Sequence, residues 1–231
     1  MFGNYGYGFD STFILLIPAM IFAFYAQTKV SSTFNKYLGV RNSNGFTGYE
    51  VARKVLDSNG LYDIPIEMIS GKLTDHYDPR HKVLRLSHEV YSGNSVASLG
   101  VAAHECGHAI QHQNQYLPLV LRNAIAPVAS FGSQAAWLLF IIGFAVNAMG
   151  LINIGILLFT AAVLFQIITL PVEFNASNRA IEMLESYGIV PIDEIAPAKK
   201  VLNAAALTYV AAALTAIMQL VRLLIFRQRR D

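Results

Sequence analysis

The stretch AAHECGHAIQH, residues 102–112, has three histidines at intervals of four residues, His104, His108 and His112, and Glu105 follows the first of them. On an α-helix, residues four apart lie on one face, about 6 Å apart along the axis. Two imidazoles at this spacing can bind one tetrahedral zinc ion at about 2.0–2.1 Å. His104 and His108 are therefore predicted to be ligands of a single zinc ion, in the arrangement HExxH.

Glu105 is the predicted general base. A bound zinc ion lowers the pKa of a water molecule to about 7, and a neighbouring carboxylate can take its proton. All six histidines lie between residues 76 and 112, which favours a real site over a chance match to a short motif. We also expect Gly107 to leave room above the metal.

His112 is not expected to bind the same ion. It lies eight residues from His104, about 12 Å along a straight helix. Zincins that take a third histidine from this segment need it where Asn114 stands, and need glycine where Gln111 stands. His112 is instead predicted to lie behind the ligands, on the substrate side or at the surface.

The third ligand must then come from another helix, and Glu173 in PVEFNASNRA is the candidate. It follows His108 by 65 residues, at the predicted start of a helix. Two predicted membrane spans lie between them, so both segments emerge on the same side. The alternative is a charge that merely favours the helix N-terminus. Other glutamates lack this position and flanking pattern: Glu67, Glu89, Glu182 and Glu185.

The composition indicates a membrane protein. Only 14% of the 231 residues are charged and 54% are hydrophobic, whereas a soluble domain has about 25% charged residues. A net charge of +2 without a long basic run excludes a nucleic-acid-binding footprint. The single cysteine, Cys106, excludes an intramolecular disulfide.

Four apolar stretches are predicted transmembrane helices, because a span needs about 17–25 apolar residues; they are residues 11–28, 128–150, 151–171 and 204–226. The first is expected to be an anchor and not a cleaved signal peptide, since the first 28 residues contain no Lys or Arg.

Two polar inserts lie between these stretches: residues 30–125, the predicted peptidase domain, and 172–200, a helical insert with the third ligand. In the first insert, Thr47 and Glu50 predict a capping box. The runs IEMISGKLTDHY and KVLRLSHEVY predict a β-hairpin that turns at Pro79, and the HExxH helix should start at Asn94 or Ser95. In the second insert, Gly188 should end a helix, and Pro197 should break the next one.

The segments HECGHAIQH and VEFNASNRA, separated by a membrane hairpin, resemble those of the YugP-type membrane zinc metallopeptidases. The N-terminal span, the run RLSHEVYSGNSVASLGVAAHE and the four-span layout are also similar, so the likeness covers nearly the whole chain. It implies a neutral zinc peptidase embedded in a bacterial cell membrane.

A wider similarity exists to HtpX-like and CAAX-prenyl peptidases, which combine HExxH with a later E-F/Y-x-A-D segment. It implies His104, His108 and Glu173 as ligands, and an α-helical membrane protein with a small α+β zincin-like domain of the minigluzincin type. Ser177 departs from this pattern, since it stands where an aspartate would orient a ligating histidine. A serine hydroxyl can accept the imidazole N–H, but without the charge.

The predicted function is hydrolysis of peptide bonds in proteins or peptides, which include membrane proteins, at a site outside the lipid bilayer. Residues 94–115 are too polar for an intramembrane HExxH helix. The strand KVLRLS is expected to pair with an extended substrate. Three residues are open candidates for the oxyanion donor: Tyr209, His112 and Arg179. The alternatives are an inactive membrane scaffold that binds partners in the same groove, and hydrolysis of a non-peptide amide.

Basic residues predict the orientation. Seven of them flank the spans on the catalytic side: Lys29, Lys36, Arg41, Arg122, Arg179, Lys199 and Lys200. On the other side lie Arg227, Arg229 and Arg230, with Arg222 inside the last span. The positive-inside rule therefore favours a cytoplasmic catalytic domain.

Overall fold

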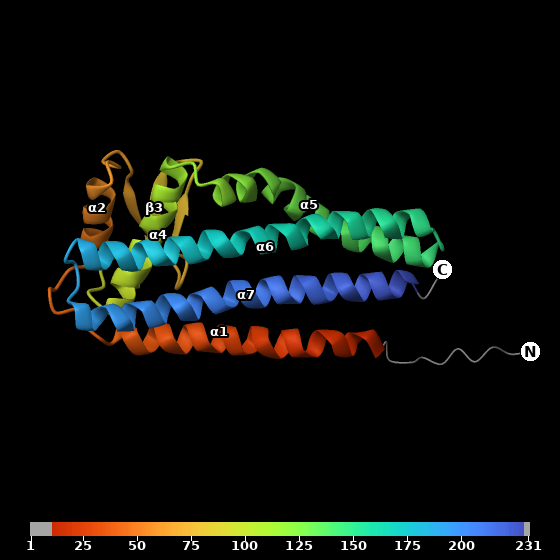
Figure 1. Ribbon diagram of the computed structural model, residues 1–231, viewed down its shortest axis with the longest axis horizontal. Helices are drawn as coiled ribbons and strands as arrows, with labels where there is room; N and C mark the ends of the chain where they lie inside the picture. Colours follow the sequence, from red (N-terminus) through yellow and green to blue (C-terminus); the bar gives the residue numbers. More distant parts are fainter. Residues whose placement is uncertain (1–10, 229–231) are drawn as a thin grey trace, which may run out of the picture. The chain divides into compact units, whose positions relative to one another are not determined.

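The computed structural model describes residues 11–228, which form a short 3-10 helix, seven α-helices and three strands (Figure 1). The elements follow in the order η1 Ser11–Leu16, α1 Ile17–Leu38, α2 Gly48–Ser58, β1 Ile66–Ile69, β2 His76–Asp78, β3 Val83–Ser87, α3 His88–Tyr91, α4 Val96–Gln113, α5 Leu117–Ala145, α6 Met149–Ser186 and α7 Ile192–Gln228. They belong to two compact units. The described residues of the first are 11–25, 125–166 and 211–228, and the second comprises residues 26–124 and 167–210.

Four helices are long and apolar enough to cross a membrane, as predicted: Thr12–Leu38, Leu117–Ala145, Met149–Ser186 and Ile192–Gln228. They extend beyond the apolar stretches of the sequence. Helix α6 continues through Pro171 to Ser186, so no separate helix begins near Glu173. The break expected at Pro197 is also absent. This proline lies in the second turn of α7, where it removes one intrahelical hydrogen bond near the start of a 37-residue helix.

The first unit is almost free of charge. Its described residues include two charged side chains, Arg222 and Arg227. The Arg222 guanidinium lies 5.4 Å from the ring centroid of Phe13 and 5.3 Å from that of Phe226, so cation–π contacts accompany the one charge inside the apolar stretch of α7. Such a surface is suited to lipid.

Helices α5 and α6 approach closely within this unit. A Cβ added at Gly155 would lie 3.0 Å from the Ala136 carbonyl oxygen, a contact that small residues permit between membrane helices. The short turn that joins the two helices contains Asn147 at φ 56°, a left-handed conformation that asparagine tolerates better than most residues.

The second unit contains a three-stranded sheet in the order β1-β3-β2. Strands β2 and β3 form the predicted hairpin, with Asp78 opposite Val83. Strand β1 instead pairs with β3 in parallel. The expectation that IEMISGKLTDHY forms one hairpin strand is therefore wrong: the run divides into two strands around Gly71 at φ 102° and Leu73 at φ 56°.

The sequence signals for two helix starts and one helix end in this unit are confirmed. Thr47 caps α2 in a reciprocal capping box with Glu50. Ser95 caps α4, and its hydroxyl accepts a hydrogen bond from the Ser98 amide. Gly188 follows α6 at φ 59°, a conformation that favours glycine.

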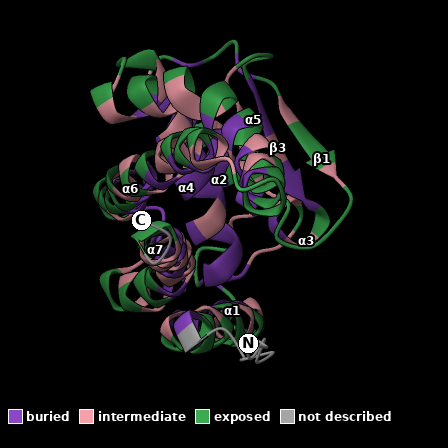
Figure 2. Cartoon of the chain, turned by 90° about the vertical axis from the view of Figure 1, so that its right-hand side faces the viewer, coloured by how far each residue is buried: buried purple, intermediate pink, exposed green. Residues whose placement is uncertain are grey.

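Helix α4 forms the centre of the second unit's core (Figure 2). Its apolar side chains, such as Leu99, are buried with residues of α2, β3, α6 and α7, among them Val51, Leu84, Leu184 and Val201. A helix enclosed in this way cannot be a lipid-facing span. The metal-ligand candidates on α4 are consequently held by protein on several sides.

Candidate metal centre

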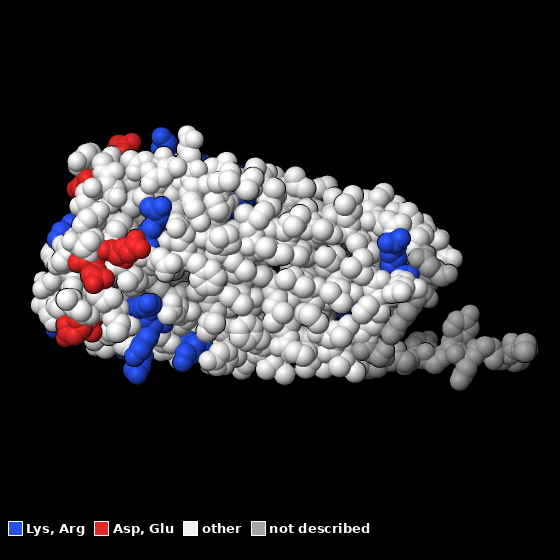
Figure 3. All heavy atoms as spheres, in the orientation of Figure 1, with Lys and Arg blue, Asp and Glu red and all other residues white. Residues whose placement is uncertain are grey.

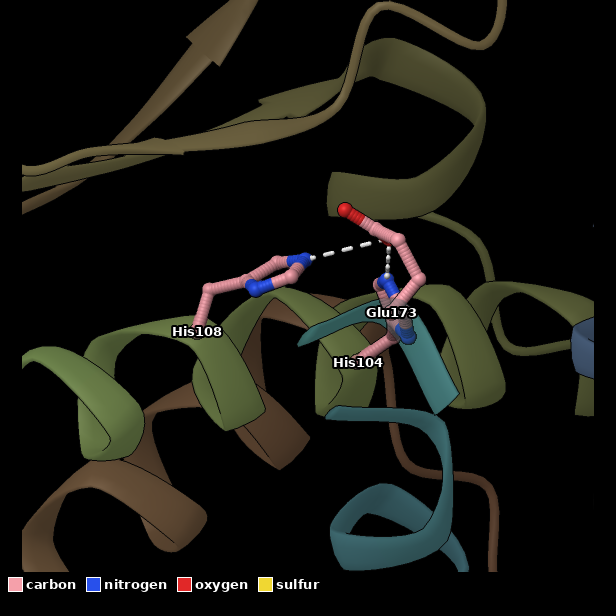
Figure 4. A group of neighbouring side chains, drawn as sticks. All are labelled: His104, His108 and Glu173. Carbon is pink, nitrogen blue, oxygen red and sulfur yellow. Dashed lines mark ion pairs between the residues drawn. The ribbon is translucent and has the colours of Figure 1, made fainter. Parts of the chain in front are cut away.

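Three side chains converge where α4 passes α6 (Figure 4). The Nε2 atoms of His104 and His108 lie 3.4 and 3.5 Å from Oε2 of Glu173, and the potential ligand atoms of all three residues lie within 4.8 Å of one another. His104 and His108 share one face of α4 because they are four residues apart. Glu173 reaches them from α6, so the predicted trio is brought together.

These distances fit a tetrahedral ion better than direct hydrogen bonds. Two ligands at 2.0–2.1 Å from a tetrahedral zinc ion are about 3.3–3.4 Å apart. The buried Oε2 of Glu173 has no hydrogen-bond partner among the described residues. Buried carboxylate oxygens are normally satisfied, so a cation between the three donors would account for this one.

The other ring nitrogens of both histidines have partners. His104 Nδ1 lies 3.1 Å from the Ser177 hydroxyl, so Ser177 contacts a candidate ligand histidine as the sequence pattern predicts. His108 Nδ1 lies 3.0 Å from Oε1 of Gln111. Since the Gln111 amide nitrogen donates to the Val172 carbonyl at 2.8 Å, its oxygen must accept, so His108 Nδ1 carries the proton. The Nε2 lone pair is then free to bind a metal.

The role of Gln111 was missed from the sequence. It is fully buried, and its amide nitrogen also donates to Asn175 Oδ1 at 3.0 Å, so it links α4 to α6 beside the ligands. A signal was present, because Gln111 lies three residues after His108 on the same helix face. Arg179 is part of this link, since its Nε donates to Asn175 Oδ1 at 2.9 Å.

The structural role of Gly107 differs from the predicted one. A Cβ at this position would lie 2.8 Å from the Ala176 carbonyl oxygen and 3.2 Å from Ala176 Cα. Glycine therefore permits the close approach of the α4 and α6 backbones. It does not create space above the metal, and its effect is to bring Glu173 within reach of the histidines.

Glu105 is held by the edge strand of the sheet. Its Oε2 accepts a hydrogen bond from the Tyr77 backbone amide at 3.1 Å, and the residue is 8% exposed. It lines a hollow of about 230 Å³ together with His108, Glu173 and Tyr209. It thus lies beside the three converging side chains and is not one of them. The anchoring amide of Tyr77 was not predicted from the sequence.

A second hollow of about 290 Å³ adjoins Glu105 and His104. Asp75 lines it and accepts hydrogen bonds from the amide and hydroxyl of Ser87, at 2.7 and 3.0 Å. Burial raises the pKa of Asp75, and the hydrogen bonds from Ser87 only partly oppose this effect.

His112 lies apart from the trio. Its Nδ1 is 2.9 Å from the Tyr77 hydroxyl, and together they line a neighbouring hollow of about 650 Å³. This placement agrees with a substrate-side position. Among the candidate oxyanion donors, Tyr209 lines the hollow that holds Glu105 and Glu173, whereas His112 and Arg179 do not.

Arg122 was not identified from the sequence as a site residue. Its Nη1 lies 3.7 Å from Oε1 of Glu173, and it lines the same hollow. Glu173 therefore lies between two histidines at one oxygen and a guanidinium at the other. Burial disfavours protonation of His108, but Glu173 and Glu105 outweigh this effect and raise the pKa of His108.

The comparisons with known proteins indicate a family of zinc peptidases. A family model described as "Putative neutral zinc metallopeptidase" matches residues 12–228. The chain is 53% identical over 218 residues to the "Putative membrane protease YugP" of Bacillus subtilis (strain 168). The aligned part is 94% of this chain and 97% of that protein. No solved structure gives a significant match. The expected family is thereby confirmed, and the chain belongs to the family described as putative neutral zinc metallopeptidases.

Proposed function

We propose that this protein is a membrane-embedded zinc metalloendopeptidase that hydrolyses peptide bonds in proteins. The observation that carries the proposal is the convergence of His104, His108 and Glu173 beside Glu105. We assign one zinc ion per chain to this trio, and we assign the second unit to a small zincin-like domain of the minigluzincin type. Residues 30–125 and 172–200 would supply this domain, and the chain would also contain four membrane spans.

Each residue of the hollow has a distinct task in this proposal. The bound zinc would act as a Lewis acid and lower the pKa of water at the site. The Glu105 carboxylate, held by the Tyr77 amide, takes a proton from the attacking water and passes it to the leaving amine. Tyr209 is the best-placed candidate to donate a hydrogen bond to the oxyanion, because it alone of the three candidates lines this hollow.

The strand expected to bind substrate needs correction. Strand β3, which contains most of KVLRLS, is the central strand, and both its edges are paired. A strand can be added only at a free edge. Strand β2 is an edge strand of the described sheet, and His76 and Tyr77 line the hollow with Glu105. We therefore assign substrate pairing to β2.

The decisive experiment compares the purified protein with Glu105→Gln. Removal of a general base lowers turnover by about 10²–10⁴-fold, whereas the zinc content should be unchanged, because Glu105 is not one of the converging donors. The matched control is Glu185→Gln, an exposed glutamate on α6. Proteomic comparison of membranes that contain either variant would identify the substrates.

The result also separates the peptidase from a membrane scaffold. A scaffold does not need a base, so Glu105→Gln would leave its cellular effect intact. Near-normal proteolysis by Glu105→Gln would instead remove the hydrolytic assignment of this residue.

A further inference from the structure

Another hollow, with three lysines in its lining, lies between α1 and α7, within the second unit. Its volume is about 510 Å³. Helix α1 contributes Lys29, Thr33, Lys36 and Tyr37, and helix α7 contributes Lys200, Asn203, Ala204 and Leu207. None of these residues lines the hollows that adjoin Glu105.

The charges of this hollow are of one sign. Its three lysines are exposed, and no ion pair is recorded for any of them among residues 11–228. Figure 3 shows basic side chains gathered over the neighbouring parts of α1 and α7. Two acidic residues begin α7, Asp193 and Glu194, but neither lines the hollow, and Glu194 accepts a hydrogen bond from the Ser43 amide at 3.0 Å. The hollow is therefore suited to an anion.

The sequences of both helices place these lysines where an apolar stretch ends. No charged residue precedes Lys29 among the described residues of α1, and none occurs in residues 201–221 of α7. The latter stretch is about 30 Å long as a helix, the thickness of a bilayer's hydrocarbon core. A membrane span that covers these apolar stretches would place Lys29 and Lys200 at the level of phospholipid headgroups.

The lining also changes character along α7. Asn203 and, across the hollow, Thr33 offer neutral hydrogen-bond donors beside the lysines. Ala204 and Leu207 lie further along α7, within its charge-free stretch, and offer apolar contacts. A ligand with a phosphate at one end and hydrocarbon at the other matches this order, whereas a free phosphate would leave the apolar part unused.

We propose that this hollow binds the headgroup of an anionic phospholipid. The three ammonium groups would surround the phosphate, and the part of an acyl chain nearest the headgroup would lie against Ala204 and Leu207. The site is independent of the proposed peptidase chemistry. It would fix α1 against α7 at the membrane surface, since both helices contact the same lipid.

The test uses the full-length protein, purified in detergent and stripped of lipid. Native mass spectrometry would measure the retention of phosphatidylglycerol against phosphatidylcholine in wild type, Lys200→Gln and Lys199→Gln. Lys199 is the matched control, because it is the adjacent exposed lysine on α7 but lines a different hollow. Each membrane-adjacent lysine contributes about 1 kcal/mol, which is about fivefold in affinity.

We expect Lys200→Gln to weaken phosphatidylglycerol binding about fivefold. The triple variant Lys29→Gln/Lys36→Gln/Lys200→Gln should abolish the preference for phosphatidylglycerol over phosphatidylcholine. Lys199→Gln and Lys200→Arg should bind phosphatidylglycerol as wild type does. Equal losses in Lys199→Gln and Lys200→Gln would overturn the proposal, because they would indicate attraction by net charge alone. Displacement of the lipid by inorganic phosphate at equal concentration would overturn the lipid assignment in favour of a free anion. Circular dichroism and zinc content would verify that each variant is folded.

Discussion

The donors from α4 and α6 should depend on one another, because two imidazoles on one helix hold an ion poorly without a third ligand. Glu173→Ala should therefore release zinc as severely as His108→Ala. His112→Ala should keep one zinc ion per chain, since His112 bonds to Tyr77 and lies outside the trio. Zinc per protein, measured by mass spectrometry of the purified variants, checks this. Loss of the ion in His112→Ala with retention in Glu173→Ala would show that the ligand assignment is wrong.

The hydrogen bonds behind the ligands should have a smaller effect. Ser177→Ala and Gln111→Ala each remove the partner of one histidine Nδ1, and such changes lower metal affinity by about 10–100-fold. Competition with a zinc chelator measures the affinity. Unchanged affinity in both variants would contradict the orienting role of these two residues.

Local spacing made part of this site predictable and tertiary packing hid the rest. The HExxH interval is a property of one helix, so His104, Glu105 and His108 follow from the sequence. Glu173 follows from its flanking pattern and from the count of spans. The Tyr77 amide offers no side-chain signal, because any residue at that strand position would supply an N–H. Arg122 has none either, since its position depends on how α5 starts beside α6.

At the scale of the elements, the crossing of α4 and α6 is the sensitive feature. Gly107→Ala would place a Cβ 2.8 Å from the Ala176 carbonyl, and overpacking of this kind costs about 1–3 kcal/mol. The helices must separate, so zinc affinity should fall together with stability. Gly100→Ala is the matched control, because its Cβ would lie no closer than 3.7 Å to Ala198, and alanine favours a helix by about 1 kcal/mol over glycine. Equal zinc affinity in the two variants would refute this role for Gly107.

The β2–β3 hairpin should weaken in acid. Asp78 bonds to the His81 ring at 2.7 Å and the Arg85 guanidinium at 2.9 Å, and these partners lower the pKa of Asp78 below its usual value. A carboxylate with a lowered folded-state pKa stabilises the fold above its unfolded pKa of about 3.9, and this contribution is lost as the pH falls further.

Hydrogen exchange of residues 76–87 between pH 2 and 6 would measure this loss. Asp78→Asn should have lower protection at pH 6 and little further acid dependence. Asp193→Asn, at the exposed start of α7, should behave as wild type. An identical acid response in Asp78→Asn and wild type would exclude the Asp78 cluster as its cause.

The sheet shows why element pairing was only half predictable. Pro79 identifies the turn between β2 and β3, and adjacent strands joined by a short turn pair antiparallel. The parallel pairing of β1 with β3 has no local signal, because it requires the chain to reverse between residues 69 and 76. Gly71 and Leu73, with positive φ, make that reversal. Leucine is uncommon there, and the pattern gave no reason to expect it.

At the scale of the whole molecule, the second unit is assembled from two chain segments, residues 26–124 and 167–210. The chain between them contains most of α5 and the first part of α6, and both helices are candidate spans. A peptidase unit built from both segments needs an even number of crossings between them. The composition predicts four spans, and the structure has four helices that are long and apolar enough to be spans. Two of the predicted spans lie between His108 and Glu173, and this even number is the reason that Glu173 could be connected to the HExxH helix from the sequence.

We predict the orientation of the second unit from the distribution of charge. The basic residues that flank the spans on the peptidase side outnumber those at the C-terminal end, and the positive-inside rule places the richer side in the cytoplasm. The described residues of the first unit contain Arg222 and Arg227 as their charges, so the contrast comes mainly from the second unit. We therefore expect both chain ends outside. A phosphatase fusion at Asp231 should be active and a fluorescent-protein fusion dark, while fusions in the loop after α2, at Asn59, should show the opposite. A fusion at Asp231 that reports a cytoplasmic position would reverse the orientation and place the metal centre on the outer side.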